Sequence, residues 1–109
     1  MEMPPTGENN QEKIEKEKVL EMLRTNGLEH FETNELVTKW TLQKEAEVKK
    51  ENTSRAAILL NIDRTDLYIA IGDNEGAIKN LEDALEQADQ ENEKELQDQI
   101  IEKIKALKI

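Results

Sequence analysis

The sequence predicts an all-α protein, an antiparallel array or bundle of about five helices. Apolar residues recur at helical spacing along most of the chain. The 109 residues include only 4 Gly and 2 Pro, while 37% of them are charged. This balance is typical of helical soluble proteins and disfavours a β-sandwich. The length allows one small domain.

We expect that domain to span residues 10–109 and residues 1–9 to form a disordered lead-in. The first residues are polar, contain both prolines and lack the apolar stretch of a signal peptide. No window approaches the roughly 18 apolar residues of a membrane span. These observations predict a cytoplasmic protein that makes no membrane contact.

The first two helices are predicted over 10–25 and 35–50. Gly27 ends the first helix, because glycine readily adopts the left-handed conformation found at helix ends. Thr33 and Asn34 are the candidate caps of the second. The apolar sides of these two helices consist of Val19, Leu20, Leu23, Leu36, Val37, Trp40 and Val48. The second half of the second helix is nearly all polar, so we expect only its front to be well buried.

The third predicted helix, over 53–71, has apolar residues around most of its circumference and is therefore expected to be the central element. Gly72 stops this helix and Asp73 caps the next one, which is predicted over 74–88 with an acidic outer face. The last helix is predicted over 93–108, and its apolar residues are Leu96, Ile100, Ile104 and Leu107. Its C-terminal lysines suit the negative end of the helix dipole.

Six residues near the middle of the chain follow a spacing known from one repeat family, namely Tyr68, Gly72, Asp73, Ala77, Leu81 and Ala84. The segment 58–88 therefore resembles a single tetratricopeptide repeat (TPR), in which glycine makes the interhelix turn and alanines allow close helix approach. Asn61 and Arg64 depart from the pattern, which has Trp and Leu at these places, whereas Thr65 falls on its small position. No second repeat is detectable about 34 residues earlier.

The resemblance implies a TPR-like hairpin over 54–88, followed by a capping helix over 93–108. In that family the first helix of each hairpin lines the concave surface, and the matching positions here are Leu59, Ile62, Asp66, Ile69 and Ala70. Because this face is largely apolar, it implies a groove for an amphipathic helix. The occupant is either a partner or the protein's own helix 35–50. Trp40 is a candidate aromatic anchor and equally a candidate core residue.

The charge and the residue types exclude several function classes. The net charge of −10 disfavours binding to nucleic acid or to an anionic membrane. The chain has 0 Cys and one histidine, His30, and Ser54 lacks the flanking glycines of a nucleophile elbow. Asp73 and Gly76 do not have the spacing of a calcium loop. We therefore predict no catalytic residues, no cofactor and no metal site.

The function predicted from the sequence is a non-catalytic protein–protein interaction module, such as a small adaptor, chaperone or regulatory subunit. Its expected partner is a protein or peptide: an amphipathic helix, a basic protein attracted by the acidic segment 73–98, or a second copy of the chain. The alternative is a helix-turn-helix DNA-binding regulator that uses residues 19–50. Its recognition helix would carry Lys39, Lys44, Lys49 and Lys50, with Glu35, Glu45 and Glu47 opposing them.

Overall fold

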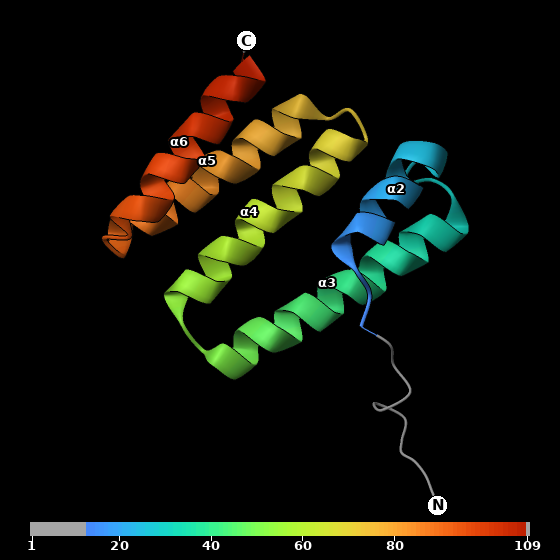
Figure 1. Ribbon diagram of the computed structural model, residues 1–109, viewed down its shortest axis with the longest axis horizontal. Coiled ribbons are helices and arrows are strands. Elements are labelled where there is room, and N and C mark those ends of the chain that lie inside the picture. Colours follow the sequence, from blue (N-terminus) through green and yellow to red (C-terminus); the bar gives the residue numbers. More distant parts are fainter. Residues whose placement is uncertain (1–12, 109) are drawn as a thin grey trace, which may run out of the picture.

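The computed structural model describes residues 13–108 and confirms the all-α class. These residues form five helices and no strand: α2 (Lys16–Asn26), α3 (Phe31–Glu51), α4 (Ser54–Ala70), α5 (Asn74–Gln90) and α6 (Lys94–Lys108). The array is flat, with principal dimensions of 52 × 33 × 15 Å (Figure 1). The predicted lead-in over 1–9 lies outside the described residues.

Helix α4 is the central element, as its apolar circumference predicts. It packs against α5 on one side and against α2 and α3 on the other, and α5 packs in turn against α6. Consecutive helices run in opposite directions along the chain (Figure 1). The polypeptide therefore crosses the array back and forth, and α4 joins its two halves.

Two hydrophobic cores lie on opposite sides of α4. The α4–α6 core consists of Ile58, Ile62, Leu81, Ala84, Ala88, Leu96 and Ile100. The α2–α3 core consists of Val19, Leu23 and Trp40, with Leu36, Val37, Leu60, Leu67 and Ala70 packed around them. Because α4 contributes side chains to both cores, it needs apolar residues around most of its circumference.

The starts of α4 and α5 are fixed by side-chain caps, and the cap of α5 is the one predicted from the sequence. The Thr53 hydroxyl accepts a hydrogen bond from the backbone N–H of Ala56 at 3.1 Å, and the Asp73 carboxylate accepts one from Gly76 at 2.8 Å. Gly72, between the two helices, has a φ of 81°, in the left-handed region where a side chain is disfavoured. The observed bounds of α4, α5 and α6 lie within two residues of the predicted ones.

The predicted starts of the first two helices were wrong. Residues 13–15 are not helical, so α2 begins at Lys16, and the start expected at residue 10 lies outside the described residues. Helix α3 begins at Phe31, and both Thr33 and Asn34 lie inside it. Thr33 is fully buried, and its hydroxyl accepts a hydrogen bond from Asn26 at 3.4 Å. Its contact with the end of α2 thus replaces the capping role expected from residue type alone.

Candidate partner-binding groove

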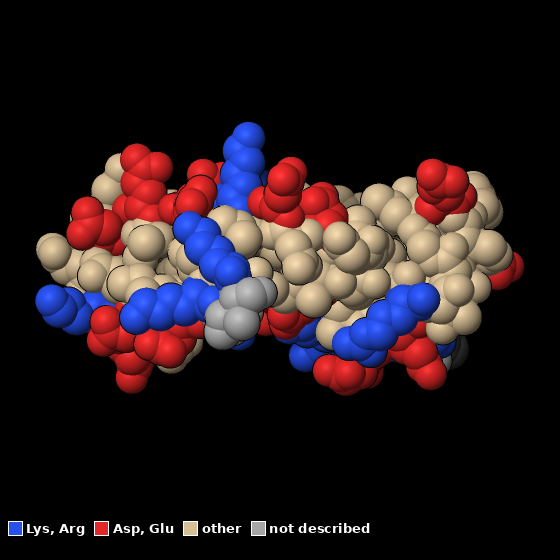
Figure 2. Space-filling model, turned by 90° about the horizontal axis from the view of Figure 1, so that it is seen from above, with Lys and Arg blue, Asp and Glu red and all other residues tan. Residues whose placement is uncertain are grey.

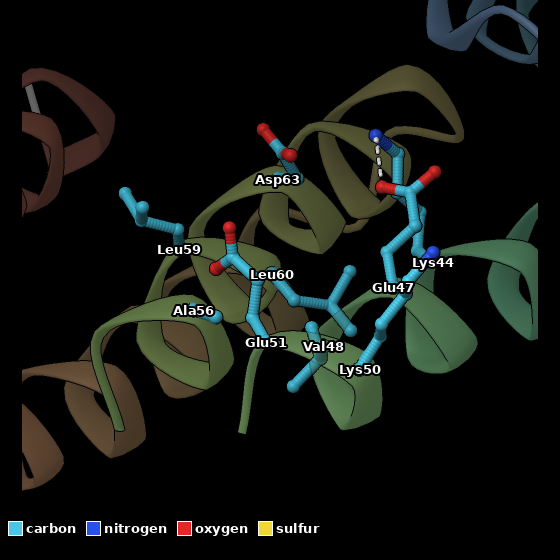
Figure 3. A pocket seen from close by; sticks show the side chains of 9 residues that line it. All are labelled: Lys44, Glu47, Val48, Lys50, Glu51, Ala56, Leu59, Leu60 and Asp63. Atoms are coloured by element: carbon cyan, nitrogen blue, oxygen red, sulfur yellow. Dashed lines mark ion pairs between the residues drawn. The ribbon is translucent and has the colours of Figure 1, made fainter. Parts of the chain in front are cut away.

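An open groove separates the C-terminal half of α3 from the first half of α4. It has a volume of about 450 Å³ and is lined by Lys44, Glu47, Val48, Lys50, Glu51, Ala56, Leu59, Leu60 and Asp63 (Figure 3). The two helices are joined by a short turn in which Asn52 adopts a left-handed conformation, with a φ of 56°. Asparagine tolerates this conformation better than most residues. We call this feature the α3–α4 groove.

The floor of the α3–α4 groove is apolar. Leu60 and Val48 reach toward each other between the two helices, and Ala56 lies beside them on α4 (Figure 3). Leu59 stands at the outer edge with 40% of its surface exposed. Exposed leucines are common on protein surfaces. Leu59 differs from an isolated exposed leucine because it adjoins a hollow whose floor is also apolar.

Charged side chains surround this floor. On α3, Lys44 and Glu47 form an ion pair at 3.6 Å, and Lys50 and Glu51 follow one turn later. Asp63 is the charged residue on the α4 side. The rim thus carries both signs on α3 and only negative charge on α4.

Helix α2 lies beside the groove, in the space between α3 and α4. The ammonium of Lys16 is 3.1 Å from an oxygen of Asp63 and 2.6 Å from an oxygen of Asp66. Just before the helix, the backbone N–H of Ile14 donates a hydrogen bond to the side-chain oxygen of Gln43, at 3.0 Å. These contacts hold the start of α2 at the edge of the α3–α4 groove.

The ion pairs of Lys16 give this attachment a pH dependence. Burial lowers the pKa of Lys16, but hydrogen bonds to Asp66 and Asp63 and their negative charges outweigh burial and raise the pKa above its ordinary value. Because the pKa of Lys16 is raised in the folded state, its ion pairs stabilise the fold fully at any pH below the ordinary lysine pKa of about 10.4. This contribution is lost as the pH rises through the pKa of the folded state.

We therefore expect Lys16→Gln to lower the free energy of unfolding at pH 7 by up to about 1 kcal/mol, since the three side chains are partly solvated. The difference from the wild-type protein should shrink above the ordinary lysine pKa. Urea denaturation at neutral and at alkaline pH measures both quantities. Lys18→Gln, at an exposed position of the same helix, is the control and should leave stability nearly unchanged. A difference that persists at alkaline pH would mean that Lys16 acts through packing rather than charge.

The structure does not bring the five predicted surface residues together on one open face. Leu59 lines the groove, whereas Ile62 is buried in the α4–α6 core. Asp66 is held in its ion pair with α2, and Ala70 packs against the α2–α3 core. Ile69 is exposed but does not line the groove. The protein's own helices thus cover part of this face of α4 and leave the part around Leu59 open.

Trp40 is a core residue. Its exposed fraction is 0%, and it lies at the centre of the α2–α3 core. The alternative interpretation of Trp40 as an aromatic anchor on the surface was wrong, because a side chain without exposed surface contacts no partner in this conformation. The indole N–H has no hydrogen-bond partner among the described residues.

The sequence analysis placed Val48 on the apolar side of helix 35–50 but did not identify the polar half of that helix as a wall of a groove. Val48 is a branched apolar residue in an otherwise polar stretch. Val48 follows Val37 by eleven residues and Thr41 by seven, so all three lie on the same side of the helix. That spacing indicates that α3 faces α4 along most of its length, including its polar half.

The described residues were also searched for features of DNA-binding, metal-binding and membrane-spanning proteins. The four lysines of the candidate recognition helix do not share one face of α3, and Lys44 among them is paired with Glu47 in the groove. Within residues 13–108, no three His, Asp or Glu side chains are grouped to hold a metal ion. None of the described helices is long and apolar enough to cross a membrane.

The chain was compared with protein-family models, with curated proteins and with solved structures, and none of the three comparisons finds a match.

Proposed function

We propose that this protein is a non-catalytic interaction module whose α3–α4 groove binds an amphipathic helix of a partner protein. The observation that carries the proposal is the groove itself, an apolar floor bounded by charged side chains and left open by the described residues. Amphipathic helices bind in such grooves by placing their apolar stripe on the floor.

The charge of the chain indicates the chemistry of the partner. Asp63 on the α4 wall is already paired with Lys16, but the whole chain carries a net charge of −10. A partner helix with basic residues beside its apolar stripe would be attracted to this acidic chain, and electrostatic complementarity of this kind favours fast and specific association. The proposed partner segment is therefore amphipathic and basic.

The hairpin formed by α4 and α5 supports an adaptor of the TPR-like kind. Ala77, Leu81 and Ala84 are fully buried, in keeping with the roles of small residues at close helix contacts and of a large apolar residue that fills space. Asn61, one of the polar departures, is accommodated by a hydrogen bond, since its amide donates to Gln87 at 2.7 Å. A lone hairpin flanked by α2, α3 and α6 is the form of the module that we propose.

Selection of binding peptides from a displayed library of helical sequences against the full chain tests this function. We expect the enriched peptides to be amphipathic and basic, and to shift the NMR signals of residues around the groove. Leu59→Glu should weaken their binding at least tenfold, because it places a charge where an apolar side chain is buried in the complex. Ile101→Glu is the matched control on α6, since Ile101 is 37% exposed and Leu59 is 40% exposed.

Two results would contradict the proposal. The first is that the selected peptides bind equally well to the wild-type protein and to Leu59→Glu. The other is a dimer, seen by light scattering, that Leu59→Glu dissociates, because a second copy of the chain would then occupy the groove in place of a different protein.

A further inference from the structure

A second hollow lies at the other end of the contact between α3 and α4. Its volume is about 220 Å³, and its apolar walls are formed by Leu23, Leu28, Val37, Leu67, Tyr68 and Ile71. Arg64 of α4 also lines it, so we call it the Arg64 pocket. It shares no lining residue with the α3–α4 groove.

Arg64 lacks the acidic partner that comparable side chains have. Residues 13–108 contain three half-buried basic side chains, Lys16, Lys44 and Arg64. The first two form ion pairs with acidic residues, whereas Arg64 makes no ion pair with any residue that the structure describes. This is unexpected in a chain with 25 acidic residues. A half-buried arginine that forms no ion pair with the described residues is well suited to a carboxylate, which a guanidinium binds through two parallel hydrogen bonds.

The rim of the pocket is apolar and partly exposed. Leu28 and Ile71 stand at its rim with 40% and 38% of their surfaces exposed. They belong to the α2–α3 and α4–α5 turns, which lie at the same end of the array (Figure 1). Figure 2 looks onto this end and shows an uncharged band between the charged side chains of the two broad faces. An apolar group in the pocket would therefore also contact the exposed parts of Leu28 and Ile71.

The volume of the pocket favours a peptide over a small molecule. Sites for small ligands usually measure about 300–1,000 Å³, and this pocket is smaller. Its volume is better suited to one anchoring side chain of a larger partner, of the kind that dominates the energetics of protein interfaces.

We infer that the Arg64 pocket binds a segment of a partner protein in which a large apolar side chain is followed by an Asp or Glu. The apolar side chain enters between Leu28, Leu67 and Tyr68, and the neighbouring carboxylate binds the guanidinium of Arg64. The α3–α4 groove selects a basic segment and the Arg64 pocket an acidic one. The inference therefore does not depend on the proposed function of the groove.

Three short probes test the inference on the full chain by NMR titration. The peptides are Gly-Leu-Glu-Gly, Gly-Leu-Gln-Gly and Gly-Ala-Glu-Gly, each N-acetylated and C-amidated so that the side chain is the only carboxylate. We expect the Leu-Glu probe to shift the amide signals around Arg64, Tyr68 and Ile71. The Leu-Gln probe should bind about tenfold more weakly, in line with the strength of a charged hydrogen bond. The Ala-Glu probe should also bind more weakly, because it lacks the apolar anchor.

Variants then assign the effect to the guanidinium. Arg64→Gln should reduce binding of the Leu-Glu probe to the level of the Leu-Gln probe. Lys103→Gln, at an exposed position on α6, changes the net charge equally and should have no effect. Raising the salt concentration to about 1 M, where the Debye length is about 3 Å, should weaken the Leu-Glu probe selectively.

Equal affinity of the wild-type protein for the Leu-Glu and Leu-Gln probes would overturn the inference, and this comparison does not depend on how the variants fold. Shifts confined to residues outside the pocket would overturn it as well. Octanoate that binds as tightly as the Leu-Glu probe would show that the site takes a free apolar acid, and would overturn the assignment to a protein segment.

Discussion

Replacing Trp40 by alanine is expected to lower the free energy of unfolding by about 3–5 kcal/mol, the usual cost of removing a buried aromatic side chain. Trp40 is fully buried and packs with Val19 and Leu23 between α2 and α3. Since small domains are stable by only about 5–15 kcal/mol in total, this one substitution removes a large share of the stability. It should also loosen α2, whose described apolar contacts converge on the same core.

Urea denaturation followed by circular dichroism measures this loss, because the variant lacks the only tryptophan of the chain. Leu42→Ala, on the same helix but 60% exposed, is the control and should change stability by less than about 0.5 kcal/mol. In the wild-type protein, the emission of Trp40 should be that of an indole shielded from water. Water-exposed emission, or a loss of less than about 1 kcal/mol in Trp40→Ala, would contradict the position of Trp40 in the α2–α3 core.

The parts of the fold that could be predicted from the sequence are those fixed by local chemistry. Thr53 and Asp73 cap their helices through side-chain bonds within three residues, and Gly72 supplies the left-handed turn between them. The start of α3 could not be predicted in this way. Thr33 has the residue type of a cap, but its hydroxyl meets Asn26 of α2, a tertiary contact that leaves no local signal.

The candidate sites were only partly predictable for a related reason. The apolar residues around α4 indicate burial on several sides but do not say which neighbour covers which side. Leu59 was therefore identified together with Ile62, although the first lines the groove and the second is buried against α5 and α6. Arg64 was visible in the sequence as a polar departure from a packed pattern. Its lack of an acidic partner could not be predicted, because the sequence does not show which carboxylates pair with Lys16 and Lys44 instead.

Leu81→Ala is expected to lower the free energy of unfolding by about 2–5 kcal/mol. Leu81 is fully buried in the α4–α6 core, where Ile58, Ile62 and Leu96 are among its members. The residues between these helices are close-packed, so the cavity left by the substitution is not easily filled. Glu82→Ala, at the next and exposed position of α5, is the control and should have little effect.

This variant also tests whether the two cores unfold together, because Trp40 reports on the α2–α3 core while circular dichroism reports on all helices. Helix α4 supplies Ile58 and Ile62 to one core and packs Leu60 and Leu67 against the other. When the α4–α6 core opens, α4 loses its support, and α2 and α3 then lose the surface on which they pack. We therefore expect the fluorescence and dichroism transitions of Leu81→Ala to coincide, as in a two-state domain. A fluorescence transition at higher urea would show that α2 and α3 hold Trp40 without α5 and α6, and that the α3–α4 groove belongs to an independently stable half of the molecule.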